Sequence, residues 1–296
     1  MNKWSSAFDK LRERNWQEIC SQFEISTPFI FDSSKYDTDV GEIVEDVSGD
    51  DFKEGSYVVE LPGRDLILAQ EALFYVAKFS HVLDCARKLA ERGAVTWSSS
   101  DAHHASILGA RAIVALFGVL PCRLGDRNVI LDFRPELGRI DYRRKFRRAN
   151  RDKQNPVLVL IPREKLLEQR HVWLLLNRIL RVCEFSEGEM AATADSLAAI
   201  KTGSHKPNRN KLLYAPNYWT WKRDLSAPYI PKKDVESFLK GDEDDRFIDF
   251  YVCRLVNKLL LLLLKDLADN LSFDIPQTFP LLESNVDTDP ILSSLH

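Results

Sequence analysis

The sequence predicts a mostly α fold: a helical bundle built on a long antiparallel helix hairpin, with a small β-ribbon insertion. Two stretches with apolar residues at helical spacing, residues 64–92 and about 98–119, predict the hairpin. Two short apolar runs, residues 129–133 and 157–161, predict the ribbon. With 45% apolar residues, a chain of 296 residues can bury a sizeable core.

The first 63 residues are expected to form an N-terminal helix, over residues 3–24, followed by an acidic segment. Residues 32–54 contain nine acidic side chains and two lysines. This segment is either a solvated stretch, a surface for a basic protein partner, or a pseudo-substrate that shields the basic stretch 139–153. Residues 1–18 are polar and have no apolar central run, so we expect no signal peptide and a cytoplasmic protein.

The predicted hairpin has recognisable ends. Gly93 follows the first helix and is typical of a helix terminus. Ser98, Ser99, Ser100 and Asp101 are expected to supply the N-cap of the second helix. Small residues within the second helix should let it approach a neighbour closely; they are Ala102, Ala105, Gly109, Ala110, Ala112 and Ala115.

Helical patterns resume after the ribbon, at about residues 164–185, 189–201 and 244–271. The leucine run 259–264 is far shorter than the roughly 20 apolar residues that a membrane span needs, so it predicts a buried core helix. Three prolines predict an irregular tail over residues 276–296. Residues 64–275 are therefore expected to form one domain, with the ribbon and a basic insertion at about 121–163.

Composition excludes several classes of site. The net charge of −3 makes no global case for nucleic-acid binding, which must rest on local patches. The five cysteines are scattered without a CxxC pair, which argues against a zinc knuckle and favours reduced thiols. The chain has no phosphate-binding loop, GxSxG, HExxH or kinase motif. We expect no cofactor and no bound metal.

A local basic patch lies between the two strand-like runs. Residues 139–153 contain eight lysines or arginines and two aspartates, with two aromatic residues interleaved. Phosphates favour cations and aromatic faces stack on exposed bases, so the pattern suits RNA or single-stranded nucleic acid. A protein partner or a solvated surface would fit the same residues. The predicted nucleic-acid-binding residues are Tyr142, Arg143, Arg144, Lys145, Phe146, Arg147, Arg148 and Arg151.

A second candidate site follows the helix predicted over residues 189–201. It combines Arg209 and Asn210 with Tyr214, next to His205. Arginine can hold a phosphate bidentately, and a histidine ring can move protons near neutral pH. A purely structural role, with the arginine capping carbonyl groups and the tyrosine anchoring the bundle, is the alternative.

With the preceding helix pair, these residues resemble the HEPN superfamily, especially the HEPN-like group that includes YaaC-like proteins. The resemblance covers roughly residues 65–270 and implies an all-α bundle with a β-ribbon after its second long helix. In HEPN ribonucleases, an arginine, a polar residue and a histidine help a ribose 2′-OH attack the neighbouring phosphate without a metal, at a dimer cleft. Arg209 and Asn210 match the first two positions, whereas Tyr214 occupies the histidine position. Tyrosine titrates near 10, so it is a poor base at pH 7.

A third candidate is Asp101-x-His103-His104. Adjacent histidines on a helix point about 100° apart and rarely chelate one ion, so hydrogen bonding at a helix start is the favoured interpretation. The leading functional hypothesis is an RNA- or single-strand-binding protein, a homodimer or a subunit of a complex, in a prokaryotic toxin or phage-defence system. Metal-independent ribonuclease activity is the catalytic form of this hypothesis. The alternative is a non-catalytic interaction or scaffold subunit.

Overall fold

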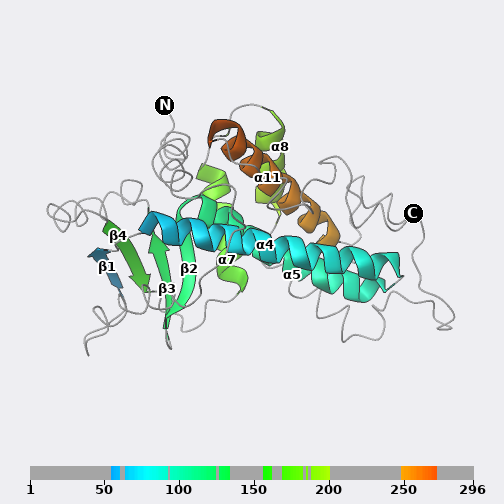
Figure 1. The fold of residues 1–296 in the computed structure, drawn as a ribbon, viewed down its shortest axis with the longest axis horizontal. Coiled ribbons are helices and arrows are strands. Elements are labelled where there is room, and N and C mark those ends of the chain that lie inside the picture. The colour runs from blue at the N-terminus through cyan, green and yellow to red at the C-terminus, as the bar shows by residue number, and fades with distance from the viewer. Residues whose placement is uncertain are drawn as a thin grey trace. The chain divides into compact units, whose positions relative to one another are not determined.

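The computed structural model describes residues 55–60, 64–92, 94–124, 127–133, 156–161, 169–182, 185, 188–200 and 248–271. Over these residues the protein is mostly helical, with a small antiparallel sheet (Figure 1). This confirms the predicted fold class at that level. The described residues fall into two compact units, and helices α4 (Arg64–Glu91) and α5 (Val95–Leu116) contribute to both.

The first unit, the sheet unit, contains α4 up to Phe74, α5 from Arg111, helix α7 (Gln169–Val182) and four strands. The strands are β1 (Gly55–Glu60), β2 (Val119–Leu124), β3 (Arg127–Asp132) and β4 (Pro156–Ile161). They form an antiparallel sheet in the order β1-β4-β3-β2. Buried Val129, Leu131 and Phe133 alternate with half-buried residues along and just after β3, as expected for a strand with one face in the core.

The sheet is larger than the predicted ribbon. Strands β3 and β4 match the two predicted runs, whereas β1 and β2 were not predicted. Strand β2 begins within the stretch assigned to the second helix, because α5 ends earlier, at Leu116. Gly118 has a φ of 78°, and its amide donates to the carbonyl of Ala115, so the chain leaves the helix there and turns into β2. Pro121 lies in β2, an edge strand that pairs with β3 alone in this sheet.

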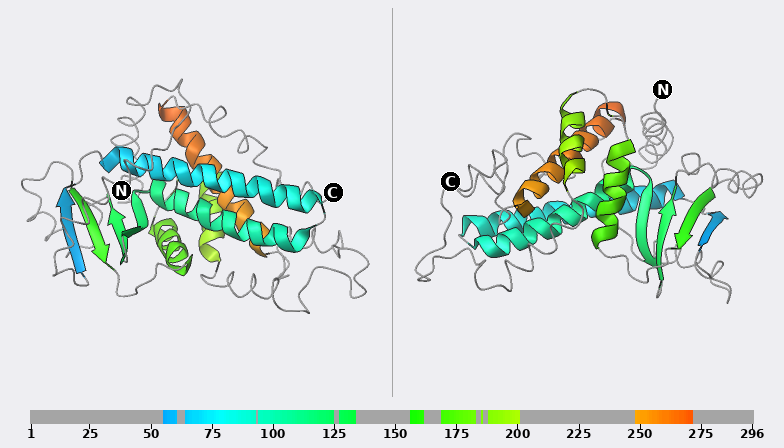
Figure 2. Two further views of the ribbon diagram at one scale, coloured as in Figure 1. Left: turned by 60° about the horizontal axis from the view of Figure 1, so that its bottom comes forward. Right: turned by 180° about the vertical axis from the view of Figure 1, so that it is seen from behind.

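The second unit, the helical unit, contains α4 from Tyr75, α5 up to Ala110, helix α8 (Glu189–Ala199) and helix α11 (Ile248–Leu271) up to Ala268. In this unit α4 and α5 run antiparallel and side by side (Figures 1 and 2). Ser98 donates a hydrogen bond from Oγ to the carbonyl of Ala86, 2.6 Å away, which joins the start of α5 to the end of α4. Lys258 of α11 pairs with Glu189 of α8.

Gly109 of α5 lies where three helices of this unit approach one another closely. A Cβ atom at this position would clash with Val256 of α11 and lie 3.0 Å from the ring of Phe79 on α4. The expectation that small residues in the second helix permit close approach is therefore confirmed at Gly109.

The leucine run of α11 is buried, as predicted, except for Leu262, which is half-buried. Leu259, Leu260, Leu263 and Leu264 are fully buried, and Leu261 is 8% exposed. Among the described helices, none combines the length and the apolar character that crossing a membrane requires.

The start of α5 differs from the prediction. The helix begins at Val95, so Ser98 to Asp101 lie within its first two turns instead of capping it. These serines are buried, and the hydroxyl of Ser98 bonds to a carbonyl of the neighbouring helix α4. A pattern of hydroxyl residues is typical of a helix cap, but here the three serines lie in a buried stretch of α5.

Candidate functional site

The two leading candidate sites lie outside the described residues. This holds for the proposed catalytic set Arg209, Asn210, Tyr214 and His205. It also holds for the basic stretch 139–153, including every residue proposed to bind nucleic acid. Both sites stay predictions. The polar clusters described below lie within the described residues.

The third candidate, Asp101-x-His103-His104, lies on α5 in the helical unit, and its two histidines have opposite environments. The His103 side chain is 3% exposed, whereas His104 is exposed. Their ring centroids are 5.9 Å apart and the ring planes are inclined by 75°. The first ring thus lies in the core and the second faces solvent, as the 100° step between adjacent helical residues predicts.

His103 contacts Asp249, which is far away in the sequence. Its Nδ1 lies 3.0 Å from Oδ1 of Asp249, on the first turn of α11, and the Asp249 side chain is 1% exposed. An ionised carboxylate only accepts hydrogen bonds, so the Nδ1–H of His103 donates. The imidazole is buried with its partner, and the pair therefore joins α5 to α11 instead of presenting a base to a substrate. Asp249 was not predicted from the sequence, although a single acidic residue among the apolar and aromatic residues 248–253 was a usable signal.

Asp101 lies on the half-buried side of α5. Burial raises the pKa of its carboxyl, and the nearby charge of His104 partly offsets this rise. Within the described ranges, no three side chains of the His, Cys, Asp or Glu types are arranged to hold a metal ion. Of these three residues on α5, Asp101 is half-buried, His103 is buried and His104 is exposed.

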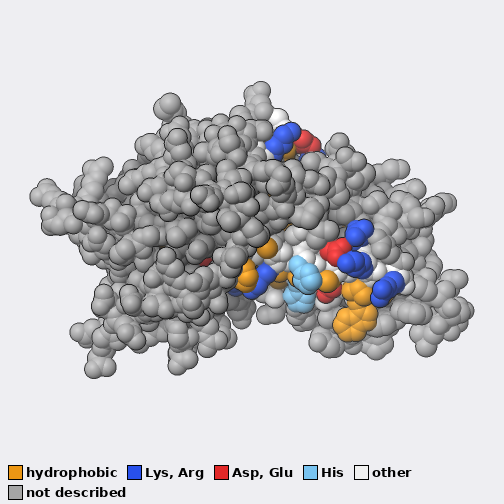
Figure 3. All heavy atoms as spheres, in the orientation of Figure 1, with side chains coloured by type: hydrophobic (Ala, Val, Ile, Leu, Met, Phe, Trp, Pro, Cys, Tyr) orange, Lys and Arg blue, Asp and Glu red, His pale blue; other side chains and the backbone are white. Residues whose placement is uncertain are grey.

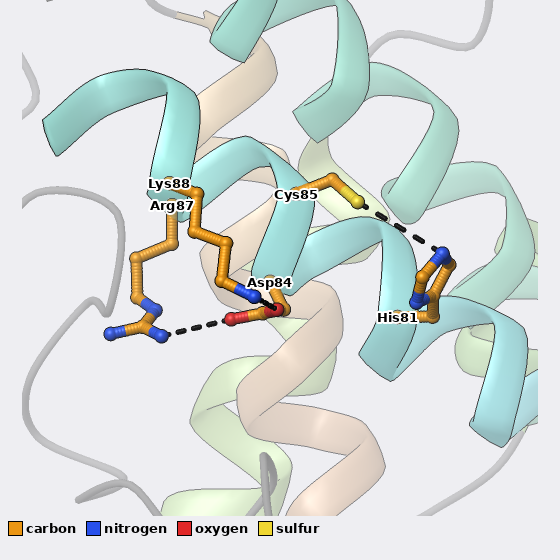
Figure 4. Close-up of polar contacts among 5 residues, drawn as sticks. All are labelled: His81, Asp84, Cys85, Arg87 and Lys88. Carbon is orange, nitrogen blue, oxygen red and sulfur yellow. Dashed lines mark hydrogen bonds and ion pairs between the residues drawn. The ribbon is translucent and has the colours of Figure 1, made fainter. Parts of the chain in front are cut away.

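A cluster on the outer face of α4 was not identified from the sequence. His81 and Cys85 are four residues apart, and Cys85 Sγ lies 4.0 Å from His81 Nε2 (Figure 4). Asp84 points away from them and pairs with Arg87, 2.8 Å away, and with Lys88. Hydrogen bonds from Arg87 and Lys88 lower the pKa of the Asp84 carboxyl. The usable signal was the i, i+4 spacing of His81 and Cys85, which places two metal-ligand types on one helix face.

The sheet unit contains a further half-buried cysteine, Cys122. Burial raises the pKa of the Cys122 thiol far above its usual range, and the carboxylate of Glu71 raises it further. Arg111 acts in the other direction without cancelling these effects. A raised pKa disfavours the thiolate form of Cys122, which is the form that acts as a nucleophile.

Charge on the visible surface is mixed. Figure 3 shows histidine, lysine or arginine, and acidic side chains close together on the described part of one face, with hydrophobic groups beside them. Trp97 of α5 is 56% exposed, whereas its neighbours Thr96 and Ser98 are buried. The described part of that face has no extended area of one charge sign, so a case for nucleic-acid binding rests on the basic stretch 139–153.

Comparison with known proteins gives no relative: no family model, no curated protein and no solved structure matches this chain.

Proposed function

We propose that this protein binds RNA or single-stranded nucleic acid through the basic stretch 139–153. The observation that carries the proposal is the net charge of +6 over these 15 residues, with Tyr142 and Phe146 four residues apart among the cations. Arginine and lysine neutralise phosphates, and the two rings offer faces on which bases can stack. The whole chain has a net charge of −3, so the positive charge is concentrated in this stretch and the rest of the chain is acidic on balance.

The architecture proposed around this stretch is HEPN-like. In this proposal the α4–α5 pair is the hairpin at the centre of a bundle, and the strands are the insertion that follows the second long helix. The order of the described elements, with β2, β3 and β4 between α5 and α7, supports it. A cytoplasmic homodimer or a subunit of a prokaryotic toxin or phage-defence complex is the setting that the resemblance suggests.

The proposed catalytic form is a metal-independent endoribonuclease that uses Arg209 and Asn210, with His205 or Tyr214 near the reacting phosphate. Arginine would stabilise the charge that develops on the phosphate, and a ring group would move the proton of the ribose 2′-OH. Tyr214 in the histidine position argues for weak activity, since a phenol is rarely deprotonated at pH 7.

The second candidate function is a non-catalytic interaction subunit, with the helical unit as scaffold. The acidic segment 32–54 favours it, because a net charge of −7 over 23 residues suits a basic protein partner. Fluorescence anisotropy with a labelled single-stranded RNA separates the two functions. Affinity that falls steeply as salt rises supports nucleic-acid binding, and absence of binding at low salt supports the interaction subunit.

A further inference from the structure

We propose that His81 and Cys85 on the outer face of α4 form a binding site for one thiophilic metal ion, of the Zn²⁺ or Cu⁺ class. The two side chains come from successive turns of one helix and lie on the same side of it (Figure 4). His81 is exposed and Cys85 is half-buried, so an ion from solvent can reach the pair. Thiolate and imidazole are the two ligand types that these ions prefer.

The distance between the two ligand atoms fits such an ion. Sγ of Cys85 and Nε2 of His81 are 4.0 Å apart. With bond lengths of about 2.3 Å to sulfur and about 2.0 Å to nitrogen, a tetrahedral ion holds its ligands roughly 3.5 Å apart, and a linear one roughly 4.3 Å apart. The observed separation lies between these limits, so small side-chain rotations bring both atoms into bonding distance of either geometry.

The charged side chains near His81 and Cys85 are arranged in a way that permits a metal cation to bind. Arg87 and Lys88 follow Cys85 closely in sequence and would repel a metal cation. Both are instead paired with the carboxylate of Asp84, on the side of α4 away from Cys85 and His81 (Figure 4). The negative charge of Asp84 offsets part of the positive charge of these two partners, and their hydrogen bonds lower its pKa.

The pair supplies two ligands. Within the described residues no third side chain of the His, Cys, Asp or Glu types is arranged with them to hold a metal, and the proposed site has water in its remaining coordination positions. The site is therefore an exchangeable one, unlike the closed sites of structural zinc. In the metal-bound form the sulfur ligand is a thiolate.

The test uses the full-length reduced protein, stripped of metal and titrated with Zn²⁺ and, separately, with Cu⁺ against a chromophoric chelator. Cd²⁺ serves as a third probe, because its bond to a thiolate gives an ultraviolet absorption band that reports sulfur ligation. The variants are Cys85→Ser and His81→Ala. The matched controls are Cys122→Ser, a half-buried cysteine of the sheet unit, and His104→Ala, an exposed histidine on α5.

We expect the wild-type protein and both controls to bind one more equivalent of metal than Cys85→Ser and His81→Ala. If the stoichiometry is equal, the affinity of these two variants for the metal should be at least about tenfold weaker. The Cd²⁺–thiolate band should be weakened in Cys85→Ser. Circular dichroism confirms that each variant is folded, and His81→Gln replaces His81→Ala if the latter is not. Equal stoichiometry and affinity in wild type, Cys85→Ser and His81→Ala overturns the proposal for both ions.

Discussion

His103 on α5 and Asp249 on α11 are 146 residues apart in sequence, yet their side chains meet in the interior of the helical unit, Nδ1 to Oδ1, at 3.0 Å. Seven residues further along α11, Val256 lies against Gly109 of α5. A polar contact and a close backbone approach thus fix the register between these two helices. Apolar burial alone is non-directional and would not specify that register.

Removing either member of the His103–Asp249 pair should destabilise the protein. Asp249→Ala leaves a buried imidazole without this partner, and we expect a loss of about 1–3 kcal/mol in the free energy of unfolding. Chemical denaturation of Asp249→Ala, His103→Ala and the double variant measures it. The double variant should lose less than the sum of the single losses, with a coupling energy of about 0.5–3 kcal/mol. Strict additivity would show that the His103–Asp249 hydrogen bond contributes nothing.

Gly109→Ala tests the close approach of the helices, because the variant is destabilised if they are in contact and stabilised if they are not. In an exposed helix, alanine is more stable than glycine by about 0.5–1 kcal/mol. At position 109 the added methyl group meets Val256 and Phe79, and overpacking of this kind typically costs about 1–3 kcal/mol. We therefore expect a lower melting temperature. A stabilised Gly109→Ala variant would mean that α11 does not pack at this position.

Asp84→Asn should lower stability in a pH-dependent way. The pKa of Asp84 is depressed in the folded protein, so its carboxylate contributes stability above its unfolded pKa, and this contribution disappears as pH falls through the folded pKa. Because Lys88 is 59% exposed, the effect should be small, about 0.3–0.5 kcal/mol for each ion pair. Thermal melts of wild type and Asp84→Asn should differ at neutral pH and converge below the normal carboxyl range. A constant difference at all pH values contradicts the account.

The elements that the sequence predicted well are those with long, regular patterns. Helix α4 was expected at residues 64–92 and is observed at Arg64–Glu91, because its apolar stripe repeats over many turns and Gly93 follows it. Strands β3 and β4 were found because each is a compact apolar run. Strand β1 was missed because it contributes only Tyr57, Val58 and Val59 as a hydrophobic signal, and its place depends on pairing with β4.

The candidate sites were harder to derive from sequence. Neighbouring residues such as Asp101, His103 and His104 suggested a local cluster, but the decisive partner of His103 is Asp249, which no local pattern could assign. The His81–Cys85 pair has a helical spacing visible in the sequence. Its relevance depends on both side chains reaching the surface, which only the packing of α4 determines.

The Arg209 site provides a separate test of the catalytic proposal. If Arg209 acts on RNA from a cleft, Arg209→Ala should abolish RNA cleavage or cellular toxicity and leave the melting temperature nearly unchanged. If its role is structural, the variant should lose about 1–3 kcal/mol of stability. Tyr214→His restores the ribonuclease-like pattern, and Tyr214→Phe, which removes only the hydroxyl, is its control. A destabilised Arg209→Ala protein together with an inert Tyr214→His protein leaves the interaction subunit as the surviving function.

The central claim, that the basic stretch binds single-stranded nucleic acid, is tested most directly by the salt dependence of RNA affinity. The comparison is between wild type and a variant with Arg143, Arg144, Arg147 and Arg148 all changed to Gln, by anisotropy titration at several salt concentrations. We expect weaker binding and a shallower dependence of log affinity on log salt, by about 0.7 for each phosphate that the variant no longer neutralises. Wild-type affinity and slope in the quadruple variant, or no RNA binding by either protein at low salt, would contradict the claim.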